Sequence, residues 1–559
     1  VNKTFTWNRT YNLSYDITRS LRLDFNATNR ALIEEPTGRV NRSLDLGGDV
    51  IRDGEVIEGE NLEYSDWRDT VWASIRDFGK NLEYNQSVNL SYQLPLQKFP
   101  FLDWISSNAR YSATYNWQRA PLATQDSVGN TVTNSNQLTL SGRFNMITLY
   151  NKVPYLRKIN RNQRSRGRNQ RVRQPKPEPE EADSTKKKKI DLKIGENIAK
   201  VLMGLKNINV QYSQGHGNTL PGYDPETRVL GMDRQFEAPG LGFVFGQHDN
   251  FGPDKLSFAE YAISRNWMDT ASNQFLPFIQ TSTENLNISA TIEPIKDLRI
   301  DLNALRQEST NSQEYWRWND TIREFQVQSP QTTGNYSVSV ITWPTAFSSD
   351  DDQFMNDAYQ EFLDNRQDIS SRLAQENANS IGEHATDVGF ADGYGAAHQD
   401  VLIPAFIAAY TGQGSGDVSL SPFIKIPKPN WRVTYSGLTK LPSLDKFLKT
   451  ATISHAYRST YSISQYLTNV NSGARLNDNF VSDLQINSVS IAEQFSPLIN
   501  LDLTWLNDLQ TRVELRRDRS LTLSSANAQL TETSGNEFII GNGAVNLVIG
   551  READGGDLL

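Results

Sequence analysis

The chain has 559 residues, a net charge of −9 at pH 7 and no cysteine. The absence of cysteine excludes disulfides and thiolate metal sites, and the acidic balance disfavours nucleic acid as a partner. No apolar run approaches the ~18 residues of a membrane-spanning helix. Hydrophobic residues are only 37%, yet 21 Tyr, 24 Phe and 11 Trp are present. This mixture is typical of strands with one apolar and one polar face.

The first three predicted strands, within residues 4–18, 81–96 and 109–117, alternate between apolar and polar positions. Arg9 is the one exception on the apolar side of the first strand. Strand side chains point alternately to opposite faces, so each segment has two different faces. The apolar positions are Phe5, Trp7, Tyr11, Leu13, Tyr15, Leu90, Tyr92, Tyr111, Tyr115 and Trp117. The polar positions include Asn8, Thr10, Asn12, Ser14, Asn85, Ser87, Asn89 and Ser91.

The alternation recurs further along the chain and indicates about a dozen or more strands. Several segments reach the ~9–11 residues that cross a bilayer, whereas ordinary strands have ~5–6. We therefore predict an all-β fold that is part of a very large antiparallel transmembrane β-barrel, with long loops and one helical insertion. The apolar positions above would face lipid, and the polar positions the lumen. A large soluble β-sandwich or propeller is the alternative.

The predicted connections are of two kinds. Short turns are expected around residues 17–20, 98–105, 293–297, 441–449 and 505–509, and long loops at 31–80 and 214–284. In outer-membrane barrels the short turns are periplasmic. Three short turns resemble each other, at residues 99–104, 441–447 and 503–508. Their Leu and Trp side chains suit the membrane interface or packing between turns.

Some segments do not read as strands. Residues 157–189 combine arginines, Pro-Glu repeats and lysines, and are predicted to be a disordered basic linker. One helix is expected over residues 349–377, with Ser349 as its cap and Asp350 to Asp352 near its positive end. Two glycine-rich loops are expected, at residues 220–246 and 392–406.

These segments divide the chain into five predicted regions. Residues 1–156 and 426–559 hold barrel strands, and residues 190–343 hold strands with a large glycine-rich loop. Residues 157–189 form the linker, and residues 344–425 a helical and glycine-rich insertion. Because the chain starts at Val1 without a signal peptide, we interpret it as a piece of a longer protein.

We find no motif for catalysis. The five histidines show no metal-binding spacing, and no Gly-x-Ser-x-Gly nucleophile elbow is present. His455 occupies a position that tyrosine usually takes on an apolar strand face, which favours packing over chemistry. The sequence therefore predicts no enzyme activity, no cofactor and no metal site.

Several uncommon motifs resemble the SprA family (called Sov in some members), the outer-membrane translocon of the type IX secretion system of Bacteroidetes, also needed for gliding motility. The resemblance covers most of the chain. It rests on residues 220–223 with 240–246, 334–339, 400–410, 427–438 and 455–457.

This resemblance implies an outer-membrane protein-conducting pore that exports folded cargo with C-terminal sorting domains through a wide polar lumen. It also implies a PorV-like partner barrel at a lateral gate and a periplasmic plug protein. Members are several times longer, and barrels of 36 strands are known. The alternatives are a nutrient transporter, a lipopolysaccharide exporter, or a β-rich surface adhesin outside the membrane.

Overall fold

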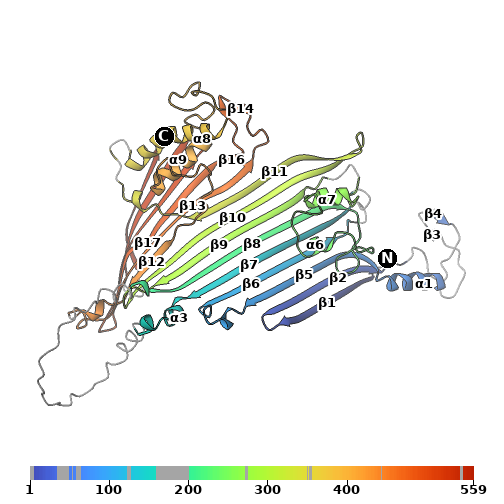
Figure 1. The fold of residues 1–559 in the computed structure, drawn as a ribbon, viewed down its shortest axis with the longest axis horizontal. Helices are drawn as coiled ribbons and strands as arrows, with labels where there is room; N and C mark the ends of the chain where they lie inside the picture. The colour runs from blue at the N-terminus through green and yellow to red at the C-terminus, as the bar shows by residue number, and fades with distance from the viewer. Residues whose placement is uncertain are drawn as a thin grey trace, which may run out of the picture.

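The computed structural model describes residues 5–33, 35, 50–52, 55–57, 64–121, 128–158, 201–270, 275–348, 351, 355–441, 443–541 and 546–558. Their main feature is one 16-stranded antiparallel sheet whose strands succeed each other nearly in chain order (Figure 1). The strands are β1 (Phe5–Thr18), β2 (Leu21–Ile33), β5 (Lys80–Leu94), β6 (Ile105–Gln118), β7 (Asn130–Asn145), β8 (Leu205–Tyr223), β9 (Phe278–Ile292), β10 (Leu298–Asn319), β11 (Glu324–Ser339), β12 (Asn430–Tyr435), β13 (Leu448–Thr468), β16 (Leu484–Ile486), β17 (Ser488–Trp505), β18 (Gln510–Ser524), β19 (Gln529–Gly541) and β20 (Asn546–Leu558). Two small hairpins, β3 (Val50–Arg52) with β4 (Glu55–Ile57) and β14 (Arg475–Leu476) with β15 (Asn479–Phe480), lie outside it.

One position in the sheet is filled by two separate strands. β11 pairs with residues 306–319 of β10 and 460–467 of β13. β12 pairs with residues 298–303 of β10 and 453–457 of β13. Both run antiparallel to β10, so β12 continues the line of β11 after residues 340–429. This insertion therefore leaves the sheet in the middle of a strand line, and it is four residues wider at each end than the predicted 344–425.

The two ends of the sheet differ in their connections. At one end, here called the short-turn end, β1–β2, β5–β6, β9–β10, β12–β13, β17–β18 and β19–β20 are joined by brief connections. The three similar turns of the sequence all lie there, with Phe101, Phe447 and Leu506 exposed. The connection from β7 to β8 also lies at this end and begins with α3 (Met146–Tyr150). Most of the predicted linker, from residue 159 onward, falls outside the described residues.

The opposite end carries the long segments. Residues 224–277 join β8 to β9, and their described part, residues 224–270 and 275–277, contains α6 (Leu241–Val244) and α7 (Phe258–Ser264). We call residues 224–270 the covering loop. The predicted glycine-rich loop was placed too early, because residues 220–223 are the end of β8. Two short turns, between β10 and β11 and between β18 and β19, also lie at this end and depart from the predicted asymmetry.

The insertion contains two helices rather than one. α8 (Asp357–Glu376) is capped by Asn356, whose side chain accepts a hydrogen bond from the Tyr359 amide at 2.9 Å. The predicted cap Ser349 and the acidic residues Asp350 and Asp352 fall outside the described residues. α9 (Gln399–Thr411) occupies a segment that we expected to be a loop, and residues 401–410 are all buried. Because every side of α9 is covered, its sequence lacks an amphipathic period.

The remaining short helices are α1 (Tyr64–Arg76), η1 (Leu96–Lys98), η2 (Trp343–Thr345) and η3 (Leu438–Lys440). Among the described residues, no helix is both long and apolar enough to cross a membrane. The predicted fold class is confirmed as an all-β antiparallel barrel wall with long loops. The strands reach 22 residues in β10 and 21 in β13, about twice the ~9–11 residues needed to span a bilayer.

Candidate functional site: the two faces of the sheet

One face of the sheet is polar along a continuous row. Strand register places thirteen residues opposite each other in sequence, one per strand from β1 to β19. They are Asp16, Arg22, Ser91, Arg110, Thr139, Ser213, Asn285, Gln307, Ser337, Ser462, Ser490, Thr522 and Thr531. All carry hydrogen-bonding side chains, so this face suits contact with water rather than lipid.

The predicted lumen positions lie on this polar face. Asn8, Thr10, Asn12 and Ser14 of β1 are exposed, and the four polar positions of β5 (Asn85, Ser87, Asn89 and Ser91) are half-buried. Neighbouring polar side chains bond across the strands, such as Asn116 Nδ2 to Asn85 Oδ1 at 2.6 Å and the Thr114 and Ser135 hydroxyls at 2.7 Å. Satisfied in this way, the face can be buried or wet without penalty.

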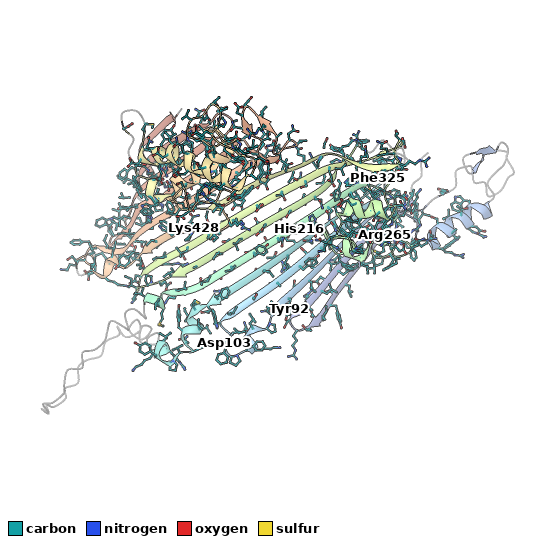
Figure 2. All side chains as sticks on the ribbon, turned by 45° about the horizontal axis from the view of Figure 1, so that its top comes forward. Tyr92, Asp103, His216, Arg265, Phe325 and Lys428 are labelled. Carbon is teal, nitrogen blue, oxygen red and sulfur yellow. The ribbon has the colours of Figure 1, made fainter. Side chains whose placement is uncertain are left out.

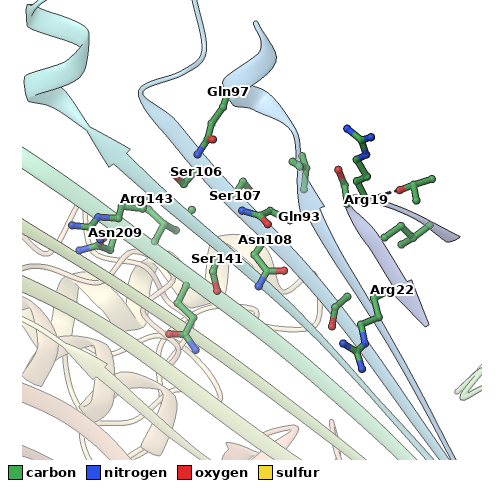
Figure 3. Close-up of a pocket in the computed structure, with 18 of the residues that line it drawn as sticks. Arg19, Arg22, Gln93, Gln97, Ser106, Ser107, Asn108, Ser141, Arg143 and Asn209 are labelled. Atoms are coloured by element: carbon green, nitrogen blue, oxygen red, sulfur yellow. Dashed lines mark hydrogen bonds between the residues drawn. The ribbon is translucent and has the colours of Figure 1, made fainter. Parts of the chain in front are cut away.

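A hollow of about 610 Å³ opens on the polar face near the short-turn end. Residues of β1, β2, β5, β6, β7 and β8 line it, and most are polar (Figure 3). Arg19, Arg22 and Arg143 contribute positive charge, and Arg22 is paired with Asp24 at 3.1 Å. The hollow is open along the polar face.

The other face carries an apolar belt next to the short-turn end. One row of opposed residues is Leu21, Tyr92, Ala109, Leu140, Tyr212 and Leu286 across β2 to β9. A second is Leu298, Tyr435, Ile453, Leu501, Val513 and Ile540 across β10 to β19. No described segment covers this belt, and large apolar side chains such as Tyr11, Leu13 and Tyr15 are exposed on it. An apolar band flanking polar strands is the signature of a lipid contact.

Above the belt, the covering loop packs on the same apolar face. Tyr115 and Trp117 are fully buried beneath it, with 1% and 0% exposure, and the Trp117 indole donates to the Pro225 carbonyl. The Tyr111 hydroxyl donates to the Phe245 carbonyl at 2.6 Å. Our prediction that Tyr115 and Trp117 face lipid is therefore wrong, because protein already covers them. Phe5, Leu90 and Tyr92 remain uncovered on the predicted face, whereas Trp7 stacks on Phe78.

The insertion covers the upper apolar face on the other half of the sheet. Its helices α8 and α9 form one hydrophobic core with strand residues such as Tyr461, Ile491 and Leu521. Figure 2 shows the two covers standing apart, the covering loop near Arg265 and the insertion above Lys428. Both lie toward the end of the sheet opposite the short-turn end.

A buried polar network fixes the start of the insertion to the sheet. The Thr342 hydroxyl donates to the Glu493 carboxylate at 2.6 Å, and so does the Tyr457 hydroxyl at 2.8 Å. Arg519 pairs with Glu493 at 3.0 Å and donates to the Thr345 carbonyl at 2.6 Å. Glu493 and Arg519 are only 1% and 3% exposed. A buried ion pair of this kind holds one geometry, because each charge depends on the other.

A second, exposed contact ties the insertion to the β14–β15 hairpin. The Arg475 guanidinium donates to both carboxylate oxygens of Asp392, at 2.9 and 2.5 Å. These hydrogen bonds, helped by the Ile381 amide, lower the pKa of Asp392 to about 2. Gly393 lies beside Phe480 at this contact, and its positive φ of 79° suits glycine.

The structure brings together two histidines that are far apart in the sequence. The rings of His216 on β8 and His248 in the covering loop stack with centroids 4.6 Å apart. Burial and the neighbouring His216 lower the pKa of His248, and Asp249 opposes the shift. The sequence signal is weak: His216 stands between Gln214 and Asn218 on a strand face that is otherwise apolar.

The other histidines have structural roles. His398 caps α9, and the Nδ1 of His455 donates to the Leu498 carbonyl at 2.7 Å while the ring lies edge-on to Trp343. Within the described residues, no group of three or more His, Cys, Asp or Glu is arranged to hold a metal ion.

No protein-family model matches the chain, and no curated protein matches it. Among solved structures it is similar to a mutant of the ferric enterobactin receptor PfeA of Pseudomonas aeruginosa (10% identity, TM-score 0.21, 98% of this chain and 61% of that chain). It is also similar to the ferric-catecholate import receptor Fiu of E. coli K12 (5% identity, TM-score 0.23, 98% of this chain and 63% of that chain). A third similar structure is BauA, the ferric preacinetobactin receptor of Acinetobacter baumannii (7% identity, TM-score 0.18, 98% of this chain and 64% of that chain). The chain spans less than two thirds of each of these proteins. Likenesses this weak carry no argument about function.

The sheet itself gives the location. Long antiparallel strands with a polar face, an apolar belt on the opposite face and short turns at one end form the wall of an outer-membrane barrel. The chain is therefore an outer-membrane protein.

Proposed function

We propose that this chain forms part of the wall of a protein-conducting translocon of the outer membrane, as its resemblance to the SprA family implies. The observation that supports this most is the row of polar residues across thirteen strands. A wall that is polar over such a width would border an aqueous passage rather than a packed core.

The width of the sheet supports a large passage. Barrel diameter grows roughly linearly with strand number, and porins of about 16–18 strands already enclose a water-filled channel. Here the path from β1 to β20 does not close on itself among the described residues, since each of these two strands has one neighbour. The path from β1 to β20 supplies 14 successive strand positions, so a barrel completed by more than about four further strands would be wider than a porin. Such a lumen suits folded cargo better than a small nutrient.

The partners of this proposed pore would be a PorV-like barrel at a lateral opening, a periplasmic plug protein, and cargo with a C-terminal sorting domain. The role of the chain would be passive, because it would supply the polar wall and hold the covers in place. The energy for export would come from outside the wall.

The absence of cysteine gives a direct test. Thr139→Cys places one thiol in the polar row, and Leu138→Cys places one beside it on the apolar face. The natural full-length gene carrying each change would be expressed with a sorting-domain cargo stalled by a tightly folded fusion that bears its own cysteine. We expect an oxidative crosslink to cargo from Thr139→Cys and none from Leu138→Cys.

Deletion of the gene should also leave sorting-domain cargo in the periplasm. Normal surface delivery of that cargo, or no crosslink from either position, would refute the translocon. If blocking the Thr139→Cys thiol instead stopped uptake of a ferric siderophore, the nutrient-transporter alternative would take its place. Solubility of the natural protein without detergent would refute the membrane assignment itself.

A further inference from the structure

Arg9 breaks the apolar alternation of β1, and the membrane wall does not account for it. Its guanidinium lies 5.3 Å from the ring centroid of Trp7 and 5.2 Å from that of Phe78. Its Nη2 donates to the Asn81 side chain at 3.2 Å. Among the described residues, the nearby ion pairs join Arg228 and Arg234 to Asp77, and none of them includes Arg9. Arg9 is therefore a cation without a carboxylate partner on an apolar face.

Arg9 lines a cleft of about 570 Å³ between β1, β2, β5 and the covering loop. This volume falls in the range of about 300–1,000 Å³ typical of small-molecule sites. Most of the lining is apolar, and we call the whole the Arg9 cleft. Its apolar walls include Tyr11, Phe25, Ala27, Tyr84, Leu230 and Phe236.

The charges of the Arg9 cleft do not cancel. Three guanidinium groups, of Arg9, Arg228 and Arg234, face two carboxylates, of Asp77 and Asp233. Asp77 is shared by two of the arginines at 3.0 and 2.8 Å. Asp233 is occupied by the backbone amides of residues 237 and 238. Arg228 also lies 3.7 Å from the Glu226 carboxylate, so Arg9 is the cleft arginine for which the described residues supply no carboxylate partner. An anionic ligand would balance its charge.

Two polar groups in the cleft also lack hydrogen-bond partners. Asn29 is only 3% exposed and stands directly opposite Arg9 in the β1–β2 register. Its buried Oδ1 accepts no hydrogen bond, and the buried Nε of Arg9 donates none. Leaving such groups unsatisfied is unfavourable, so a ligand with both an acceptor and a donor fits here. A phosphate can accept from Arg9, and a hydroxyl can donate to Asn29.

The height of the cleft indicates which molecule can reach it. Arg9 stands nine positions before Thr18, the last residue of β1 at the short-turn end. At about 3.3 Å per residue and a tilt of about 35–45°, this is about 21–24 Å along the membrane normal, close to the top of an apolar band about 25 Å tall. With the short-turn end facing the periplasm, as in outer-membrane barrels generally, the cleft lies where the acyl chains of the outer leaflet meet their headgroups.

We propose that the Arg9 cleft binds lipid A, the phosphorylated, hydroxylated glycolipid of the outer leaflet. A phosphate contacts Arg9 and the rim arginines, a hydroxyl donates to Asn29, and an acyl chain lies against Tyr11, Phe25 and Leu230. This site is independent of protein export, because it depends only on the orientation of the wall in the membrane. The bound lipid A would contact both the covering loop and the surrounding membrane lipids.

The test is titration of the full-length detergent-solubilised protein with diphosphoryl lipid A, its dephosphorylated form and phosphatidylglycerol, followed by native mass spectrometry. We expect diphosphoryl lipid A to bind most tightly. Loss of a charge-assisted hydrogen bond in Arg9→Gln should weaken it about tenfold. Arg234→Gln, at an exposed rim position, should weaken it less and cannot disturb the strand. Heat-modifiable migration on a gel would verify that each variant is folded.

Arg265→Gln is the matched control. Arg265 lies in the same covering loop, over the ring of Tyr261 at 5.4 Å, but does not line the Arg9 cleft. The Arg265→Gln variant should bind diphosphoryl lipid A as tightly as the unsubstituted protein. The proposal would be overturned if the dephosphorylated lipid bound as tightly as diphosphoryl lipid A. It would also be overturned if folded Arg9→Gln and Arg234→Gln both bound diphosphoryl lipid A as tightly as the unsubstituted protein. Phosphatidylglycerol binding as tightly as lipid A would overturn the assignment to a glycolipid.

Discussion

The covering loop and the insertion perform the same structural task by different means. Both protect the upper part of the apolar face, where the strands extend beyond the belt. The covering loop enters from the strand ends and packs with stacked aromatic rings, such as Phe243 on Phe258 with centroids 3.6 Å apart. The insertion leaves from mid-strand and adds the buried pair of Glu493 and Arg519 to its apolar core.

The difference indicates that the place where a segment leaves the sheet determines which contacts are needed to hold it there. A loop between neighbouring strand ends returns where it began, so apolar packing and a few amide bonds suffice to seat it. The insertion interrupts a strand line between β11 and β12, and its exit at Thr342 must be held while the two strand pieces stay aligned. Directional charge-assisted bonds supply that alignment, whereas apolar contacts alone do not.

The largest expected effect comes from removing Arg519, the buried cation of β18 that holds the start of the insertion. Arg519→Leu leaves Glu493 charged and buried without its partner, so docking of the insertion should lose about 3–5 kcal/mol. Limited proteolysis of residues 340–429 in detergent should become much faster, while the covering loop stays protected. The double variant Glu493→Leu/Arg519→Leu should recover part of the loss, since the two fully buried charges are then removed together. Unchanged protection in Arg519→Leu would show that apolar packing alone seats the insertion.

A smaller effect is expected for the covering loop. The Asn134 side chain is 1% exposed and donates to the carbonyls of Phe243 and Gln247 at 2.9 and 2.7 Å. Asn134→Ala takes this donor from the Gln247 carbonyl and the Oδ1 acceptor from the buried Asn218 side chain, at a cost of about 1–3 kcal/mol, whereas the Phe243 carbonyl keeps the Gly246 amide. Hydrogen exchange of amides in residues 240–250 should accelerate, and those of α9 should not. Asn116→Ala, which removes an amide on the polar face, serves as the control. Equal acceleration in both variants would contradict a local anchor.

The two covers should also differ in their response to mild acid. The pKa of His248 is lowered in the docked loop, so the undocked loop takes up protons first as the pH falls. The contribution of neutral His248 to docking of the covering loop is therefore complete above pH 6.5 and decreases progressively below it. Protease cleavage within residues 240–250 should therefore rise below pH 6.5. His248→Phe keeps an aromatic ring against His216 without a titrating group, and should abolish this dependence. If the pH profile survived in His248→Phe, another group would be responsible.

Much of the wall followed from the sequence, because strand alternation is local. Positions such as Tyr11 and Asn12 were assigned to opposite faces by the period of two, and the register keeps them there. Whether an apolar position meets lipid or protein is not local. Tyr115 looks like Tyr11 in the sequence, yet it lies beneath a segment more than one hundred residues later.

Three further features depended on contacts that the sequence does not display. β12 completes the line of β11 across residues 340–429, and no short-range pattern records that pairing. α9 is apolar on every side, so it gave no helical period. His216 and His248 meet only through the fold of the covering loop. The one available signal was strand length, because strands of about 20 residues exceed what a bilayer requires and indicate a second covered zone.

The smallest effect should come from the exposed link between the insertion and the β14–β15 hairpin. The pKa of Asp392 falls from 3.8 to about 2 because Arg475 donates to its carboxylate. The contact thus contributes fully above pH 3.8 and is lost as the pH drops toward 2. Between pH 6.5 and 3.8 the covering loop should loosen while the insertion stays docked, which separates the two anchors in one titration. Asp392→Asn should make protection of residues 379–395 insensitive to pH below 3.8, with little change at neutral pH because the pair is exposed to water. A large loss of protection at pH 7 in this variant would show instead that the hairpin, and not Glu493, carries the docking of the insertion.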